Sequence, residues 1–164
     1  MPNWCSNYTK IYHEDSSKID AIEQELMKED PQLFNKLLPR PLSEEENWYD
    51  WNVNNWGTKW DASVYDWGRE DENTIWVNYD TAWSPPTALF DSLGEQEYSV
   101  TSYYHEGGMG FIGYYEDGDD DYYEYDLSDV ESIENIPEHI VDYGNLMEEH
   151  ENWIEENADE GEEE

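Results

Sequence analysis

The sequence predicts an α+β protein, because its expected strands and helices follow the order β-α-β-β-α-β, with two further strands and a final helix after them. Three observations lead to this prediction. Short runs rich in aromatic and β-branched residues recur along the chain, as in strands. Two segments between these runs have apolar residues at helical spacing. The last segment combines a helical apolar stripe with many acidic residues.

The first half of the chain is expected to contain strands, helices and a hairpin. Aromatic and β-branched residues over 6–13 favour a strand. Ser17 resembles a helix start, and apolar residues then recur at helical spacing to about Glu29. The other elements expected here are one helical turn over 33–38, a short helix followed by a turn at Gly57 within 48–60, and a hairpin of strands 62–67 and 74–79.

The second half is expected to begin with a helix and continue with three strands. Pro86 suits the first turn of a helix, whose inner face would then carry Ala88, Leu89 and Leu93. The strands are expected over 98–105, 111–115 and 122–127, separated by glycine- and aspartate-rich turns.

A single C-terminal helix is expected over 137–157. Its apolar stripe has alternating spacings of four and three residues. The stripe consists of Ile136, Ile140, Tyr143, Met147, His150 and Ile154. We expect residues 1–157 to form one domain and residues 158–164 to be a disordered acidic tail. The first six elements match the split βαβ plan of the ferredoxin-like fold. The expected fold is therefore a ferredoxin-like βαββαβ sheet extended by an extra hairpin and a C-terminal acidic helix.

The charge of the chain is extreme and unevenly distributed. The formal net charge is −36, and residues 1–69 hold 13 acids against all 7 lysines and arginines, whereas residues 70–164 hold the other 30 acids. A compact chain of this length has a diameter of roughly 40 Å, over which duplex DNA carries about 24 charges. The net charge of the chain therefore matches or exceeds the charge of duplex DNA of the same length. Direct binding to nucleic acid is thereby disfavoured, and a partner with a basic, phosphate-binding groove is favoured.

Carboxylates in the last third of the chain are the candidate binding residues. Strand alternation would place Asp120, Glu124 and Asp126 on one face and Tyr123 and Tyr125 on the other. Residues two apart on a strand are about 6.7 Å apart, comparable with successive phosphates, and helical residues three or four apart are about 5–6 Å neighbours. The candidate phosphate-mimicking residues are Glu116, Asp117, Asp119, Asp120, Asp121, Glu124, Asp126, Glu138, Asp142, Glu148, Glu149, Glu151, Glu155 and Glu156.

Several local strings resemble those of a known family. They are Met1-Pro-Asn-Trp-Cys-Ser-Asn7, Trp48-Tyr-Asp-Trp51, Asn55-Trp-Gly-Thr-Lys-Trp-Asp61, Thr81-Ala-Trp-Ser-Pro-Pro86 and Gly108-Met-Gly-Phe111. With them the chain resembles small acidic phage and plasmid proteins that have a YubB-type ferredoxin-like domain. The resemblance covers roughly residues 1–127 and implies an origin in a phage or mobile element. It implies no activity, because the function of that family is unknown.

Tryptophans are concentrated in one segment. A stacking platform for bases normally accompanies a cationic groove, and only Lys59 is nearby. We therefore expect the tryptophan box, which comprises Trp48, Trp51, Trp56 and Trp60, to belong to the core. Trp83 is expected to pack likewise, through a rigid turn at the prolines that follow it.

Metal and cofactor chemistry have weak support. The acids over 116–121 are contiguous and lie between strands, unlike the alternating ligands of an EF-hand loop. The histidines at 13, 105, 139 and 150 are scattered, and none pairs with Cys5 at zinc-like spacing. We expect no metal site, no cofactor and no enzymatic activity. A divalent-ion-dependent enzyme that uses the acids over 116–126 is a remaining alternative.

These observations favour a phage-type acidic DNA mimic, whose carboxylates occupy the basic nucleic-acid-binding groove of a host protein. A defence nuclease is the favoured target, so the protein would have anti-restriction or anti-CRISPR activity. A lone cysteine and the lack of long apolar runs favour the host cytoplasm and no membrane contact. The alternative is a non-enzymatic phage structural or adaptor protein whose charge serves only solubility. The sequence leaves the oligomeric state and the identity of the target open.

Overall fold

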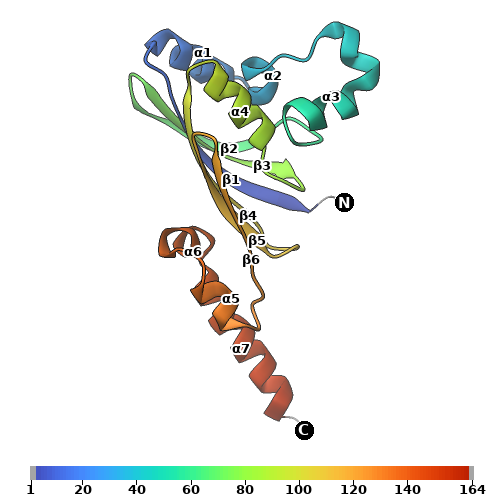
Figure 1. Ribbon diagram of the computed structural model, residues 1–164, viewed down its shortest axis with the longest axis vertical. Helices are drawn as coiled ribbons and strands as arrows, with labels where there is room; N and C mark the ends of the chain where they lie inside the picture. Colours follow the sequence, from blue (N-terminus) through green and yellow to red (C-terminus); the bar gives the residue numbers. More distant parts are fainter. Residues whose placement is uncertain (1–2, 163–164) are drawn as a thin grey trace.

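A computed structural model describes residues 3–162 of the chain (Figure 1). Its centre is one six-stranded sheet of order β2-β3-β1-β4-β5-β6, in which every neighbouring pair is antiparallel. The strands are β1 (Trp4–Tyr12), β2 (Ser63–Asp71), β3 (Thr74–Ala82), β4 (Ser99–Glu106), β5 (Phe111–Glu116) and β6 (Asp119–Glu124). The first four strands have the order of the ferredoxin-like plan, with β1 between β3 and β4, and the β5–β6 hairpin extends the sheet. The fold predicted from the sequence is confirmed.

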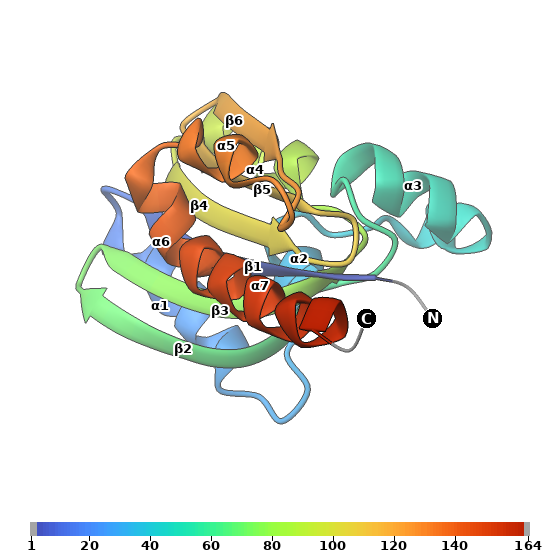
Figure 2. The ribbon, with the colours of Figure 1, turned by 90° about the horizontal axis from the view of Figure 1, so that it is seen from below.

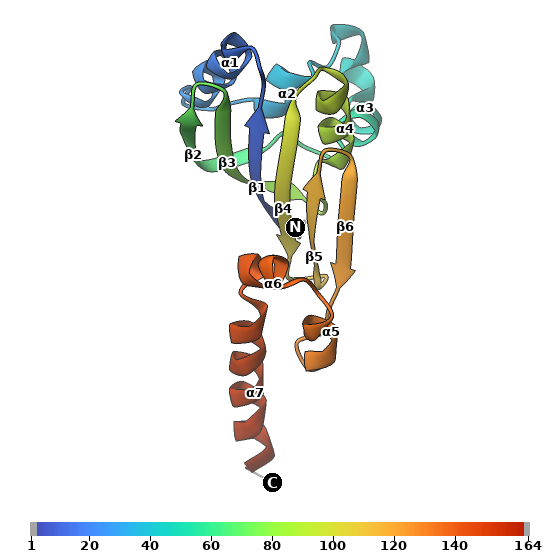
Figure 3. The same ribbon diagram turned by 60° about the vertical axis from the view of Figure 1, so that its left-hand side comes forward.

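Helices lie on both sides of this sheet. The first group is α1 (Ser16–Leu26), α2 (Leu33–Leu37), the 3-10 helix η1 (Leu42–Asn47), α3 (Trp48–Asn55) and α4 (Thr87–Glu95), and the second is α5 (Val130–Glu134), α6 (Glu138–Gly144) and α7 (Leu146–Glu162). The view from below shows α6 and α7 in front of the sheet, with α2 and α4 behind it (Figure 2). Helix α7 then points away from the sheet (Figure 3). In the described part of the chain, no helix combines the length and apolar composition needed to cross a membrane.

Each group of helices has its own core. The larger core lies between the sheet and the first group, and includes Ile19, Phe34, Val77 and Leu93. The smaller core lies under α6, where Ile112 of β5 packs with Ile133, Ile136, Ile140 and Leu146, and with tyrosines of β4, β5 and β6. The C-terminal helices are therefore fixed to the half of the sheet that contains the β5–β6 hairpin.

The prediction of a single C-terminal helix over 137–157 is wrong. The chain forms α6 and α7 instead, separated by Asn145, whose backbone is left-handed (φ 55°, ψ 36°). Asparagine tolerates this conformation better than most residues. Pro137 precedes α6 as its N-cap rather than occupying its first turn. The apolar stripe is divided accordingly: Ile140 is buried under the sheet, whereas Ile154 is nearly half exposed. Helix α7 continues to Glu162, beyond the boundary expected at 157, and residues 163–164 lie outside the described residues.

Smaller differences concern where elements begin and end. Helix α1 begins at Ser16, because the Asp15 side chain accepts the Ser17 N–H and acts as the cap. Strands β2 and β3 are both longer than expected, so only Glu72 and Asn73 connect them. Pro86 is the N-cap of α4, whose buried residues are Leu89, Phe90 and Leu93 rather than Ala88. Strand β6 ends at Glu124, so Asp126 lies in the following loop.

Candidate functional site

All of the predicted phosphate-mimicking carboxylates are on exposed residues. They form two groups. The strand array lies on the end of β5, on β6 and in the turns at the two ends of β6, and consists of Glu116, Asp117, Asp119, Asp120, Asp121, Glu124 and Asp126. The helix array lies on α6 and α7, and consists of Glu138, Asp142, Glu148, Glu149, Glu151, Glu155 and Glu156.

The strand array occupies the edge of the sheet. Strand β6 pairs only with β5, in a register that places Glu116 opposite Asp119 and Tyr114 opposite Asp121. Its other side is free (Figure 3). Carboxylates on an edge strand discourage pairing with another chain, which is a structural reason for some of them. The predicted alternation is confirmed within β6, because Tyr123 packs in the smaller core under α6, while Asp120 points to the opposite face. Tyr125 and Asp126 follow the end of the strand.

Three carboxylates of the strand array also hold the fold together. Asp117 accepts hydrogen bonds from the Ser99 hydroxyl (3.0 Å) and the Val100 N–H (2.7 Å), and so fixes the β5–β6 turn to β4. Asp120 accepts the Tyr104 hydroxyl at 2.6 Å. Asp126 accepts both the N–H and the hydroxyl of Ser128, and these bonds lower its pKa.

The Tyr104–Asp120 bond depends on a glycine. A Cβ at Gly113 would lie 2.2 Å from the Tyr104 hydroxyl oxygen, so only glycine lets that ring pass beneath β5 to reach β6. Burial raises the pKa of Asp120, although the Tyr104 hydrogen bond opposes the shift. Asp120 is therefore partly structural, whereas the side-chain carboxylates of Glu116, Asp119 and Asp121 accept no hydrogen bond within residues 3–162.

The helix array covers one side of α7. At 100° per residue, the glutamates from 148 to 156 fall within an arc of about 160°. The opposite side carries Leu146, which is fully buried, and His150, whose Nδ1 bonds the carbonyl oxygen of Leu127. These two contacts set the rotation of α7, and with it the direction of the acidic side.

The two arrays meet at the lower end of β6. Burial, together with the nearby carboxylates of Glu106 and Glu149, raises the pKa of Tyr125 to about 12. The Tyr125 hydroxyl bonds Nε2 of His105 at 2.6 Å. Glu149 of α7 also lines one hollow with Leu127 of the loop after β6, so the helix array begins close to the end of the strand array.

No cation neutralises either array in the part of the chain that the structure describes. The ion pairs there join Lys10 to Glu70, Lys28 to Glu25, and Arg69 to both Asp20 and Glu23. Every acid in these pairs lies at or before position 70. The acids beyond it form no ion pair within residues 3–162.

The tryptophan box is only partly a core feature. Trp56 is 2% exposed and Trp51 packs partly buried against the larger core, which confirms the prediction for these two. The prediction is wrong for Trp48 and Trp60, because more than a third of each residue is exposed. It is also wrong for Trp83, which is 45% exposed. Trp4 also lies on the surface.

These exposed rings gather around one lysine. The Lys59 ammonium lies 4.5 Å from the ring centre of Trp60, 5.4 Å from that of Trp83 and 5.9 Å from that of Tyr49. Trp4 lies beside Trp60, with ring centres 6.0 Å apart. The signal in the sequence was the density of tryptophan around Lys59, but it did not distinguish exposed rings from buried ones.

The acids over 116–121 do not converge as calcium ligands do. Successive strand residues point to opposite faces, so Asp119 and Asp121 diverge from Asp120. Over residues 3–162, no three histidine, cysteine or acidic side chains come together in a way that could hold a metal ion. Cys5 is buried, and burial raises the pKa of its thiol to about 12.

Comparison with known proteins gives a family and no activity. The family model described as the ferredoxin-like domain in Api92-like protein matches residues 59–153, more than half of the chain. The crystal structure of protein api92 from Yersinia pseudotuberculosis is 22% identical over 57% of this chain and 39% of that one, with a TM-score of 0.43. The chain thus spans well under half the length of that protein. No curated protein matches.

Proposed function

The chain belongs to the family that shares the ferredoxin-like domain of Api92-like proteins, and from that premise we propose that it is a non-enzymatic, phage-type DNA mimic. Its carboxylates occupy the basic groove in which a host protein holds nucleic acid. A phage or mobile element gains most from blocking a defence nuclease. A restriction or CRISPR nuclease in the host cytoplasm is therefore the favoured target.

The observation that carries this proposal is the unneutralised acidic surface. A merely soluble surface would intersperse lysine with glutamate to relieve repulsion. Here the acids beyond position 70 have no ion-pair partner within residues 3–162. Many of these acids lie on exposed residues along β6 and α7 rather than in a loose tail.

The arrangement suits an elongated groove. Carboxylates two apart on β6 are about 6.7 Å apart, and α7 adds about 1.5 Å per residue along its axis. Since α7 points away from the sheet, the helix array continues the acidic surface beyond the body of the molecule (Figure 3). Such a surface can contact more cations in a basic groove than one face of a sheet could.

Occlusion is then competitive and depends on salt. The basic groove releases counter-ions when carboxylates enter it, as it does with phosphates, and the free energy of that release falls as salt concentration rises. Long-range attraction also accelerates the encounter at low ionic strength. Duplex DNA and the protein therefore exclude each other from the same groove.

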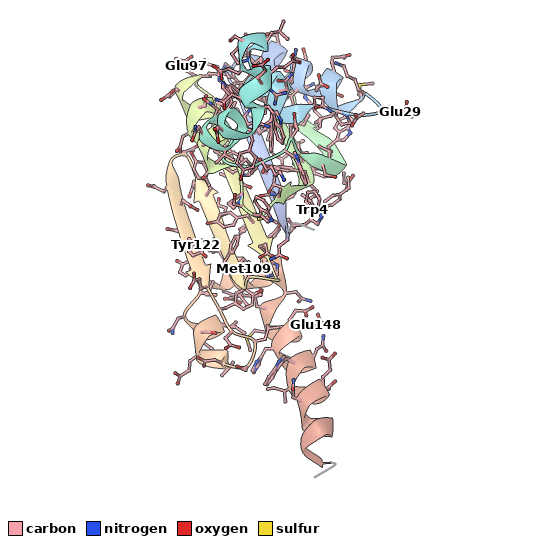
Figure 4. The ribbon with its side chains drawn as sticks, turned by 90° about the vertical axis from the view of Figure 1, so that its right-hand side faces the viewer. Trp4, Glu29, Glu97, Met109, Tyr122 and Glu148 are labelled. Carbon is pink, nitrogen blue, oxygen red and sulfur yellow. The ribbon has the colours of Figure 1, made fainter. Side chains whose placement is uncertain are left out.

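The test uses a panel of purified restriction and CRISPR nucleases, with binding and DNA cleavage measured at several salt concentrations. The test variant neutralises Glu116, Asp119 and Asp121 to Gln or Asn, because these carboxylates hold no hydrogen bond in the described structure. The matched control removes three exposed acids elsewhere, by Glu14→Gln, Glu29→Gln and Asp30→Asn; Glu29 lies in the helical layer (Figure 4).

We expect the test variant to bind more weakly with a shallower salt dependence, and the control to lose less. Each exposed charge contributes modestly, about 0.2–1 kcal/mol, so the loss is graded across the array. Added DNA should raise the apparent inhibition constant in proportion to its concentration. Binding that survives saturating DNA, or that ignores the neutralised array at low salt, rules mimicry out.

A structural or adaptor protein is the second candidate, and the exposed rings around Lys59 favour it. An exposed apolar patch of this kind marks interaction sites in soluble proteins. If the chain captures a phage protein equally well at all salt concentrations and inhibits no nuclease, the result supports the adaptor instead.

A further inference from the structure

A continuous aromatic surface lies beside the strand array. Its centre is the group of rings around Lys59, namely Trp4, Tyr49, Trp60 and Trp83, and it continues through Met109 and Tyr122. We call it the aromatic face. Met109 is 70% exposed and Tyr122 50%. Trp4, Met109 and Tyr122 lie between the helical layer and α7 (Figure 4).

Trp83 shows that this surface is more than incidental exposure. Its backbone has φ of 69°, a left-handed conformation that bulky residues rarely adopt. Such strain clusters at functional sites. The conformation is held by the Trp83 N–H, which donates to the Asn3 carbonyl oxygen at 2.8 Å. Since the indole remains 45% exposed, its burial in this chain does not offset the strain, and a contact with another molecule would.

The aromatic face adjoins the acids of β6. A hollow of about 400 Å³ is lined by Asn3, Trp83, Met109, Phe111, Tyr122 and Glu124. The Tyr122 hydroxyl donates to Glu124 at 3.1 Å. Glu124 belongs to the strand array, so a partner that contacts Trp83 through this hollow also meets a carboxylate.

The chemistry of the face selects its occupant. The faces of Trp60 and Trp83 already attract one cation, Lys59, and aromatic faces prefer the planar, weakly hydrated guanidinium of arginine. The formal net charge of −36 repels nucleic-acid phosphates and equally repels a second copy of the chain. A protein surface that bears arginine is complementary to both the rings and the carboxylates.

We propose that the aromatic face is the anchoring contact of the partner interface and seats an arginine-bearing protein surface. Guanidinium planes stack on Trp60 and Trp83, while Glu124 and the strand array pair with neighbouring cations. The acids then accelerate the encounter, and the rings supply binding that persists at high salt, as aromatic anchors do in other interfaces. The identity of the partner rests on the proposed function, but binding of arginine to the aromatic face can be tested without knowing the partner.

The probes are an arginine-only peptide and a lysine-only peptide of equal length, titrated between about 50 mM and 500 mM sodium chloride. The variants are Trp60→Ala and Trp83→Gly. Glycine adopts a positive φ without strain, so Trp83→Gly should raise the melting temperature while it weakens binding. Tyr65→Ala is the control, because Tyr65 is exposed on β2 outside the aromatic face.

We expect the arginine peptide to bind several-fold more tightly than the lysine peptide, and to remain bound at high salt. Both tryptophan variants should abolish this preference and leave the salt dependence unchanged, while Tyr65→Ala changes neither. Equal affinity for the two peptides, or an arginine preference that survives both variants, overturns the proposal. So does sedimentation that reveals a dimer which Trp83→Gly dissociates, since the face would then join two copies.

The two proposals fail separately. Neutralising Glu116, Asp119 and Asp121 should reduce the salt dependence of nuclease binding and leave the arginine preference of the peptides intact. If the neutralised variant behaves like the unchanged protein while the tryptophan variants abolish the arginine preference, mimicry is wrong and the proposal for the aromatic face is supported. If the neutralised variant has a weaker salt dependence and the arginine preference is absent, the proposal for the aromatic face is wrong and mimicry is supported.

Discussion

Trp56 and Trp60 are four residues apart and have opposite environments. Trp56 makes edge contacts with Phe34 and Trp51, and its Nε1 donates to the Leu38 carbonyl oxygen at 3.0 Å. Trp60 lies on the surface against Lys59. Gly57, with φ of 88°, turns the chain between them. Composition could predict an aromatic segment here, but not which ring faces inward, because that depends on the direction in which the turn leaves.

Stability should distinguish these two rings. Trp56→Ala removes a buried aromatic side chain and should lower the free energy of unfolding by about 3–5 kcal/mol. Trp60→Ala removes a partly exposed ring and should lower it by about 1 kcal/mol or less. Urea unfolding of the two variants measures both values. Equal losses would show that Trp60 is part of the core after all.

Lys59 is the one cation of the aromatic face within the described residues, and it should oppose a basic partner. Lys59→Met keeps most of the side-chain length, removes the repulsion and frees the ring faces. We expect the arginine peptide to bind about threefold more tightly at low salt, a change typical of one exposed charge. The control is Lys36→Met, an exposed lysine on α2 with the same change in net charge. Weaker binding, or an equal gain in the control, contradicts a role for the rings around Lys59.

At the level of elements, the sequence predicted helices and strands well where the pattern is local. The strand pairs are joined by short turns, and the order β-α-β-β-α-β follows from residues close in sequence. The break between α6 and α7 could not be found in the same way. The apolar stripe continues in phase across it, from Ile140 through Tyr143 to Met147, so periodicity does not register one left-handed residue. The available signal was the pair Gly144-Asn145, which is typical of a helix C-terminus.

Substitution of Asn145 tests whether this break is required. Asn145→Gly should leave the free energy of unfolding nearly unchanged, since glycine tolerates φ of 55°. Asn145→Ile should lower it by about 1–2 kcal/mol, because a β-branched residue is disfavoured in this conformation. Thermal unfolding followed by circular dichroism compares them. If the isoleucine variant is as stable and gains helix, α6 and α7 can join into the single helix that the stripe suggests.

For the molecule as a whole, the sequence identified the acidic residues but not their distribution in space. Counting gives their number, whereas the approach of Glu149 to Tyr125 depends on how α6 packs under the sheet. The aromatic face could not be predicted either. It combines residues from β1, α3 and the loop after it, the turn after β3, the β4–β5 turn and β6, and only the folded sheet brings these together.

The same charge distribution has a consequence for stability. Repulsion among uncompensated carboxylates opposes the compact state, and protonation relieves it. Burial raises the pKa of Asp61, Asp80 and Asp120. Folding therefore favours their protonated form, so their contribution is largest below the ordinary value of 3.8 and is lost as pH rises through the folded pKa. Asp15 and Asp126 have lowered pKa values from serine hydrogen bonds, and their contribution is lost only below the ordinary value.

Acidification from pH 7 toward the ordinary aspartate value of 3.8 should therefore raise the melting temperature, contrary to the loss expected of proteins held by paired carboxylates. His105 acts in the opposite direction, because burial lowers its pKa and its protonation disfavours folding. One imidazole is outweighed by three carboxyls and the general repulsion. Calorimetry at constant ionic strength measures the effect. Sodium chloride at pH 7 should raise the melting temperature too, and calcium chloride of equal ionic strength should add little. A steady fall in the melting temperature as pH drops from 7 would show that the acidic surface is compensated within the fold.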